Sequence, residues 1–121
     1  MNDKLILIAD DAAFMRKMIR STLSFAGYSN FIEAQNGAEA VKMFAAENPD
    51  LVLMDVTMPE MDGLEALERI MAISPSAKVI MCSAIGQDAT IMKAVRSGAS
   101  DFIVKPFKKE QLADMVANLL G

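Results

Sequence analysis

The chain has 121 residues, 53% of them hydrophobic, and a formal net charge of −4. This length predicts a single domain spanning residues 1–121, with a core of ordinary size. The acidic balance, without a basic stripe interleaved with aromatic residues, argues against a nucleic-acid-binding protein. Because the sequence contains no histidine, it excludes a histidine metal site, a histidine-based triad and a phosphohistidine carrier within these residues.

The compartment follows from what the sequence lacks. No apolar run approaches the roughly 20 residues that a membrane-spanning helix needs. The first residues, Met1 to Lys4, lead directly into a strand-like run, so we expect no signal peptide. The single cysteine, Cys82, cannot form an internal disulfide and is expected to be a small core residue. We therefore expect a cytoplasmic monomer that does not contact a membrane.

Short apolar runs alternate with amphipathic segments of helical length along the chain. This alternation predicts an α/β fold of successive βαβ units, in which helices cover both faces of a five-stranded parallel sheet. The expected strands are Leu5–Ala9, Asn30–Ala34, Leu51–Met54, Lys78–Cys82 and Asp101–Val104. The expected helices are 13–26, 37–47, 64–73, 87–97 and a last one with the apolar stripe Leu112, Met115, Val116, Leu119 and Leu120.

Helix ends and buried faces can also be predicted. We expect helix 13–26 to begin after an N-cap near Asp11 and to stop at Gly27 in a left-handed conformation. Apolar residues at helical spacing indicate the faces turned to the core. These residues are Phe14, Met18, Ile19, Thr22 and Leu23, then Val41, Phe44 and Ala45, then Leu64, Leu67, Ile70 and Met71, and finally Ile91 and Val95.

The strand Leu51–Met54 runs straight into a carboxylate, Asp55. Burying an unpaired charge is costly, so Asp55 is expected where the strand emerges from the sheet. Turn-forming residues follow, at Pro59 and Gly63. The carboxyl edge of an open parallel sheet is where such folds bind ligands.

Other polar side chains follow the remaining strands at the same edge. They are Asp10 and Asp11 after the first strand, Ser83 after the fourth and Lys105 after the fifth. Singly, each could be a helix cap or a solvated charge. Together with Asp55 they form an oxygen-only set that suits Mg²⁺, beside an ammonium and a hydroxyl that could hold phosphate oxygens. This combination favours formation of an aspartyl phosphate.

Four stretches of the chain resemble the receiver domain of bacterial two-component response regulators, and the free-standing chemotaxis regulators of that family in particular. The resemblance implies a flavodoxin-like (βα)5 doubly wound sheet with strand order 2-1-3-4-5, for which flavodoxin and the receiver domain are the usual examples. The resembling stretches are Ala9–Arg16, Met54–Gly63, Met81–Gly86 and Asp101–Phe107.

The resemblance also assigns roles at the sheet edge. It implies that Asp55 is the phosphoacceptor for a histidine kinase and that Lys105 pairs with the phosphoryl group. Asp11 would bind Mg²⁺ directly, Asp10 largely through water, and Thr57 through its backbone carbonyl. The Lys105-Pro106 bond resembles the family's cis peptide.

Further positions would respond to phosphorylation or tune it. By resemblance, Ser83 would move toward the phosphoryl group and Phe102, where the family often has tyrosine, would rotate into the vacated space. Thr57 and Ile85 occupy the positions that tune loss of the phosphate. Because an apolar Ile85 cannot orient a water molecule by hydrogen bonding, we expect slow self-dephosphorylation.

A signalling protein of this size must act by binding a partner. The expected partners are a histidine kinase, the flagellar motor switch protein and a possible phosphatase, and the protein is not expected to be an enzyme apart from its own phosphotransfer. The candidate residues for the partner face are Ile91, Met92, Lys93, Arg96, Phe102, Lys108 and Lys109.

Other functions remain open from the sequence alone. The chain could be a single-domain receiver of another two-component or phosphorelay pathway. A Mg²⁺-dependent phosphohydrolase would also use an aspartate nucleophile, and would turn over phosphomonoesters. A flavin carrier of the same fold is less compatible, because Asp10 and Asp11 would repel a phosphate after the first strand.

Overall fold

The computed structural model describes residues 2–120, in which strands and helices alternate along the chain as the sequence predicts. The strands are β1 (Asn2–Ala9), β2 (Tyr28–Ala34), β3 (Leu51–Asp55), β4 (Val79–Ala84) and β5 (Asp101–Lys105). The helices are α1 (Ala13–Phe25), α2 (Gly37–Glu47), α3 (Gly63–Ile73), α4 (Asp88–Arg96) and α5 (Lys109–Leu120). Among these residues, no helix is long and apolar enough to cross a membrane.

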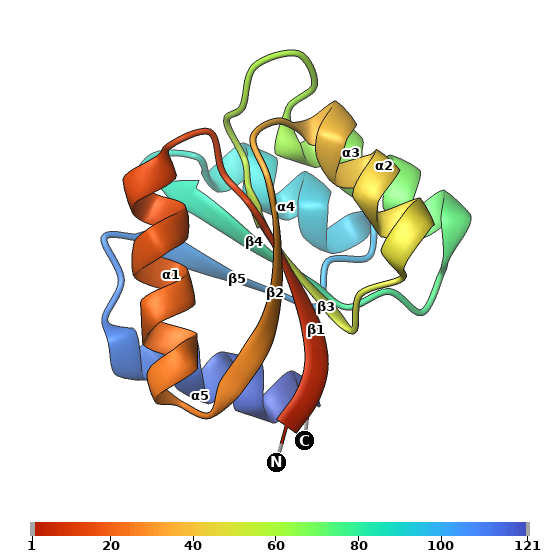
Figure 1. Ribbon diagram of the computed structural model, residues 1–121. Coiled ribbons are helices and arrows are strands. Elements are labelled where there is room, and N and C mark those ends of the chain that lie inside the picture. The colour runs from red at the N-terminus through yellow and green to blue at the C-terminus, as the bar shows by residue number, and fades with distance from the viewer. Residues whose placement is uncertain (1, 121) are drawn as a thin grey trace.

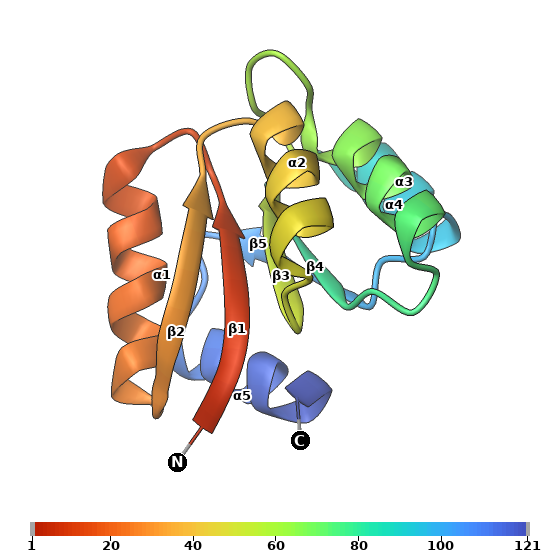
Figure 2. The same ribbon diagram turned by 45° about the vertical axis from the view of Figure 1, so that its right-hand side comes forward.

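The strands form one sheet in the order β2-β1-β3-β4-β5, and every neighbouring pair is parallel. The expected flavodoxin-like topology is therefore confirmed. Helices α1 and α5 cover one face of this sheet, and α2, α3 and α4 cover the other (Figures 1 and 2). The order places β1 and β3 side by side, so the two loops that follow them open at the same edge.

The hydrophobic core has two layers, one on each face of the sheet. In β1, Leu7 packs in the layer under α2, α3 and α4, whereas Ile6 and Ile8 pack in the layer under α1 and α5. This alternation follows from the two-residue period of a strand. Burying a side chain of this size stabilises the fold by about 1.5–3 kcal/mol, and both faces of the central strands contribute in this way.

Three strands extend further toward the carboxyl edge than the apolar runs indicate. β3 includes Asp55, β5 includes Lys105, and β4 continues to Ala84, so that Ser83 lies inside the strand and is buried. The reason is backbone pairing, since Ser83 pairs with Val104 in the β4–β5 ladder. Hydrophobicity alone therefore ends these strands too early.

The expected helix faces are mostly correct, with three errors. Phe14 is 73% exposed, and Ala45 and Val95 are also exposed. Each of them stands next to the true inward position, which is Met15, Phe44 and Ala94 respectively. One residue along a helix turns a side chain by about 100°, enough to move it from core to solvent.

The residue that caps the start of α1 also differs from the expected one. Its N-cap is Ala12, whose side chain makes no capping hydrogen bond, and Asp11 does not cap the helix. Instead, the Ala12 amide donates to Asp10 Oδ1 at 2.9 Å. The expected stop is confirmed, because Gly27 follows the helix with a φ of +106°.

Candidate functional site

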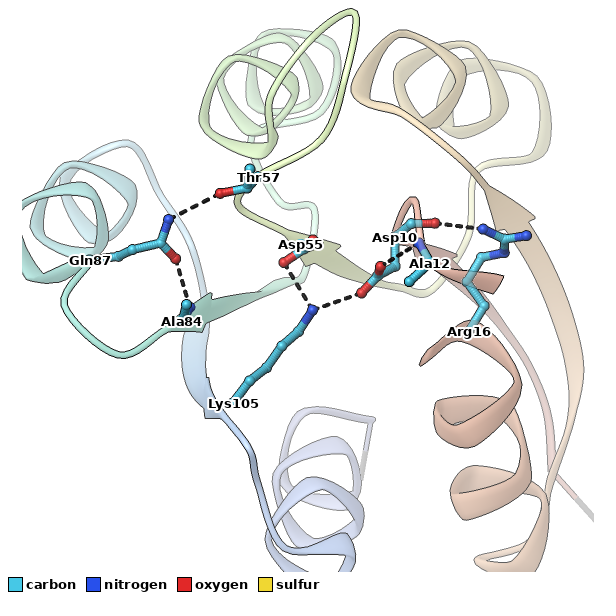
Figure 3. A network of polar contacts seen from close by, with 8 residues as sticks. All are labelled: Asp10, Ala12, Arg16, Asp55, Thr57, Ala84, Gln87 and Lys105. Atoms are coloured by element: carbon cyan, nitrogen blue, oxygen red, sulfur yellow. Dashed lines mark hydrogen bonds and ion pairs between the residues drawn. The ribbon is translucent and has the colours of Figure 1, made fainter. Parts of the chain in front are cut away.

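A lysine and two aspartates meet at the carboxyl edge of the sheet. Lys105 Nζ lies 2.9 Å from Asp10 Oδ2 and 3.1 Å from Asp55 Oδ1 (Figure 3). Asp10 follows β1, Asp55 ends β3 and Lys105 ends β5. The sheet thus brings together three of the predicted site residues from distant parts of the sequence, and the Lys105–Pro106 peptide bond is cis.

Asp11 completes a cluster of carboxylates. One carboxylate oxygen from each of Asp10, Asp11 and Asp55 lies within 4.8 Å of the other two. Asp10 and Asp55 are buried, whereas Asp11 is exposed. This oxygen-only set, open to solvent on the Asp11 side, fits the ligand preference of Mg²⁺.

The local electric field favours a cation at this place. Burial, together with the charges of Asp10 and Asp11, raises the pKa of Asp55 above its ordinary value, although Lys105 opposes this effect. Burial alone would lower the pKa of Lys105, but its hydrogen bond to Asp10 and the charges of both carboxylates outweigh burial and raise that pKa. Lys105 therefore stays charged, and three carboxylates lie around this one ammonium group.

Asp10 is fixed by backbone contacts that the sequence analysis missed. Its amide donates to Ala34 O at 3.1 Å, and its carbonyl accepts from Arg16 Nη1 at 2.7 Å. Arg16 Nε also donates to Glu33 Oε1 at 2.9 Å, and Arg20 pairs with the other oxygen of Glu33. Nothing in the spacing of these residues marks them, because the contact joins α1 to β2.

Ser83 makes no hydrogen bond to the cluster among the residues that the structure describes. Its side chain is buried, and its hydroxyl oxygen has no hydrogen-bond partner among the described residues. On the outer side of Ser83, a groove of about 320 Å³ is lined by apolar side chains that include Ile85, Met92 and Phe102. Phe102 is 41% exposed and Ile85 is 81% exposed.

The predicted partner face is exposed with one exception. Ile91 is buried and forms part of the core layer under α4, because it is the inward residue of that helix turn. The other residues predicted for this face are exposed, namely Met92, Lys93, Arg96, Phe102, Lys108 and Lys109. The face is therefore a basic and apolar surface of α4, β5 and the start of α5.

Gln87 is a residue of the site that the sequence analysis did not identify. Its side-chain oxygen accepts from the Ala84 amide at 2.6 Å, and its nitrogen donates to Thr57 Oγ1 at 3.1 Å (Figure 3). Thr57 itself is exposed, just beyond Asp55. The two loops that border Asp55 are thereby joined.

Cys82 takes no part in the cluster, although it pairs with Asp55 across the β3–β4 ladder. Its side chain is buried, and burial raises the pKa of its thiol to about 12. The thiol is thus protonated at neutral pH and packs as a small core residue, as expected.

The chain is similar to known proteins along most of its length. Residues 6–117 match the family model described as the response regulator receiver domain. A chemotaxis protein CheY from Thermotoga maritima is 50% identical over 111 residues, which cover 92% of each chain. A chemotaxis protein CheY from Listeria monocytogenes is 53% identical over 109 residues, which cover 90% of this chain and 92% of the relative.

Solved structures agree with the sequence comparison. A crystal structure of a CheX–CheY–BeF3–Mg complex from Borrelia burgdorferi contains a chain that superposes with a TM-score of 0.91. That chain is 33% identical, and the match covers 98% of this chain and 90% of that one. With the family model matched along most of its length, the chain belongs to the response regulator receiver domain family.

Proposed function

We propose that this protein is a phosphorylation-activated signalling switch, in which Asp55 accepts a phosphoryl group from the phosphohistidine of a histidine kinase. The observation that carries the proposal is the position of Lys105 Nζ, 2.9 Å from Asp10 and 3.1 Å from Asp55. A lysine poised between a nucleophile and a second carboxylate is suited to hold a phosphoryl oxygen.

The transfer exchanges one bond to phosphorus for another. A carboxylate oxygen of Asp55 attacks phosphorus, the O–P bond forms, the P–N bond breaks, and the leaving imidazole takes up a proton. Lys105 draws the phosphoryl group toward Asp55 by its charge. Mg²⁺ would be held by Asp10, Asp11, Asp55 and the backbone carbonyl of Thr57. When bound, the ion supplies positive charge that stabilises the negative charge developing on the phosphoryl oxygens.

Phosphorylation then shifts an existing equilibrium of the loop after β4. The Ser83 hydroxyl, buried without a hydrogen-bond partner among residues 2–120, is free to move toward a new phosphoryl oxygen. Phe102 would rotate into the space that Ser83 leaves, which changes the surface of α4, β5 and α5. Slow self-dephosphorylation is expected from the apolar Ile85, which is turned to solvent.

We place the switch in chemotaxis because relatives that are 50% and 53% identical to this chain are named chemotaxis proteins. The proposed cycle is that of a cytoplasmic monomer that receives phosphate from a chemotaxis kinase, binds the flagellar motor switch protein and is reset by a phosphatase. The binding face would be formed by the exposed residues Met92, Lys93, Arg96, Phe102, Lys108 and Lys109. Loss of directed swimming after deletion of the gene tests this part of the proposal, and normal chemotaxis would favour another two-component pathway.

The phosphoacceptor is tested by intact-mass analysis after incubation with acetyl phosphate. The wild-type protein should gain the mass of one phosphoryl group with Mg²⁺ and little without it. Asp55→Asn should gain none, and the matched control Asp114→Asn, an exposed aspartate of α5, should behave as wild type. Equal phosphorylation of Asp55→Asn and the wild type would refute the assignment.

Turnover of a phosphomonoester separates a signalling switch from a phosphohydrolase. A switch acquires one phosphoryl group from acetyl phosphate and loses it slowly. A Mg²⁺-dependent phosphohydrolase would release many equivalents of phosphate from a phosphomonoester such as p-nitrophenyl phosphate. Sustained turnover of that substrate, lost in Asp55→Asn, would favour the enzyme instead.

A further inference from the structure

The loop between β4 and α4 is tied to the neighbouring loop by one side chain, Gln87. The amide of Ala84 can only donate, so the atom of Gln87 that faces it at 2.6 Å is the side-chain oxygen. This orientation turns the Gln87 nitrogen toward Thr57, whose hydroxyl accepts at 3.1 Å. The side chain thus spans from the end of β4 to the loop after β3, alongside Asp55 (Figure 3).

Gln87 also connects this bridge to α4. It is the residue that precedes the first turn of that helix, and its backbone carbonyl accepts from Ile91 N at 3.0 Å. Its side chain makes no capping hydrogen bond to the helix, because both of its polar atoms are used in the bridge. A single residue therefore contacts three segments: β4, the loop after β3, and α4.

The bridge conflicts with the movement that phosphorylation demands. In the proposed function Ser83 moves toward the phosphoryl group on Asp55. The Ser83 carbonyl and the Ala84 N–H belong to one planar peptide unit, so a movement that includes the backbone of Ser83 also moves the Ala84 N–H. A hydrogen bond of 2.6 Å cannot absorb such a movement, because its energy falls steeply with distance and angle.

The loop can change shape once the bridge is gone. Gly86, between Ala84 and Gln87, has a φ of +94°, a conformation that glycine adopts without strain. A Cβ placed on Gly86 would meet no atom within 4 Å, so the space around this residue is open. The loop therefore has room to rearrange, and Gln87 is what joins it to Thr57.

We propose that Gln87 is a positioning residue that holds the loop after β4 in the resting state, and that phosphorylation of Asp55 must break its bridge to Ala84 and Thr57. This inference rests on the proposed function, because it names what opposes the switch. Removal of the bridge shifts the equilibrium toward the released loop before any phosphate is present. Because the residue also leads into α4, release at Ala84 is transmitted to the surface that carries Met92.

The first measurement needs no phosphorylation. Hydrogen exchange of the Ala84 amide, followed by NMR in the metal-free protein, should be about five- to tenfold faster in Gln87→Ala than in the wild type, the loss expected for one hydrogen bond. Gln87→Glu keeps an acceptor for the Ala84 amide, and the Thr57 hydroxyl can donate to its carboxylate, so its exchange rate should stay close to that of the wild type. Gln111→Ala, an exposed glutamine of α5, is the matched control and should leave Ala84 unchanged.

The second measurement tests the link to the chemistry. Gln87→Ala should be phosphorylated by acetyl phosphate with Mg²⁺ at least about threefold faster than the wild type, because the released loop is more populated. Thr57→Val removes the other end of the bridge and should reproduce part of this gain. The double variant Gln87→Ala/Thr57→Val should gain no more than Gln87→Ala alone, because both changes break one bridge.

Unchanged exchange of the Ala84 amide in Gln87→Ala would overturn the holding role, and so would additive effects of the two substitutions. Faster exchange with an unchanged phosphorylation rate would contradict the link to the switch. If the wild type itself accepts no phosphoryl group, the proposed function fails, whereas the exchange rates still decide whether Gln87 holds the loop.

Discussion

Lys105 forms its shorter ion pair with Asp10, at 2.9 Å, and its longer one with Asp55, at 3.1 Å. In the resting protein the lysine is thus shared between a carboxylate proposed to bind metal and the proposed phosphoacceptor. A phosphoryl group on Asp55 would add negative charge on the Asp55 side of Lys105. The lysine, already in contact with Asp55, is positioned to respond to that charge.

Loss of Lys105 should destabilise the fold. Lys105→Met leaves Asp10 and Asp55 without their lysine partner, which we expect to lower the free energy of unfolding by about 2–4 kcal/mol at pH 7. This is somewhat below the roughly 3–5 kcal/mol for breaking a fully buried pair, because Lys105 is only half-buried. Because the folded-state pKa of Lys105 is raised above 10.5, its contribution is complete below 10.5 and is lost as the pH rises through the folded-state value. Urea denaturation at pH 7 and above 10.5 measures this loss, with the exposed Lys109→Met as control.

Asp55→Asn should have the opposite effect. The folded-state pKa of Asp55 is raised above 3.8 by burial and by neighbouring carboxylates, so its ionised form costs stability at neutral pH. We expect the substitution to stabilise the metal-free protein by about 1 kcal/mol at pH 7, a typical size for one residue. The gain should vanish below pH 3.8, where the carboxyl is protonated in both states. A substituted protein that melts below the wild type at pH 7 would contradict the repulsion described for this cluster.

Magnesium should stabilise the wild-type protein. At about ten times its dissociation constant, an ion that binds only the folded state adds about 1.4 kcal/mol. Asp11→Asn removes an exposed ligand without disturbing the core, and should abolish most of this gain. Thermal melts with and without MgCl2, compared with Asp114→Asn, test the carboxylate cluster independently of phosphorylation.

Glu33 should stabilise the protein only above acidic pH. Its burial alone would raise the pKa, but the hydrogen bonds and charges of Arg16 and Arg20 outweigh burial and lower it below 4.5. Its contribution is therefore present above pH 4.5 and disappears as the pH falls through the lowered value. We expect Glu33→Gln to cost about 0.5–1.5 kcal/mol at pH 7 and little in strong acid, as measured by urea denaturation beside the exposed Glu110→Gln.

Gly63 allows α3 to begin directly against the strand that carries the phosphoacceptor. Its amide donates to Val56 O at 2.7 Å, and a Cβ on this residue would overlap the carbonyl oxygen of Asp55. We expect Gly63→Ala to cost about 1–3 kcal/mol, as overpacking does, and to slow phosphorylation by displacing Asp55. Gly27→Ala, a glycine far from the cluster, should destabilise the fold without changing the phosphorylation rate, and an equal rate in both variants would contradict this explanation.

The sequence allows the main features of the site to be predicted because the sheet imposes them. In a parallel sheet the residues that follow the strands lie at one edge. The sequence alone therefore predicts that Asp10, Asp55 and Lys105 lie close together. The same rule does not fix side-chain contacts between loops. The bridge of Gln87 depends on the positive φ of Gly86 and on the length of β4, and neither follows from the hydrophobic pattern.

The errors in the helices have a related cause. The period of a helix is known, but its rotation about its own axis is set by the residues that it meets in the fold. Phe14 and Val95 are apolar and correctly spaced, yet the neighbouring residues Met15 and Ala94 face the core. For the same reason Ile91, although next to Met92 in the sequence, is buried and only contributes to the lining of the groove beside it.

The order of the strands also separates the proposed phosphorylation site from the surface proposed to bind a partner. Strands β1 and β3 each hold a neighbour on both sides, whereas β5, among the strands described, is bonded to β4 alone. Asp10 and Asp55 thus lie at the ends of strands that are hydrogen-bonded on both sides and are hard to deform. Phe102 lies on an edge strand, which is hydrogen-bonded on one side and deforms more easily. A conformational change at Phe102 can therefore spread along the edge strand while the carboxylates that follow β1 and end β3 keep their alignment.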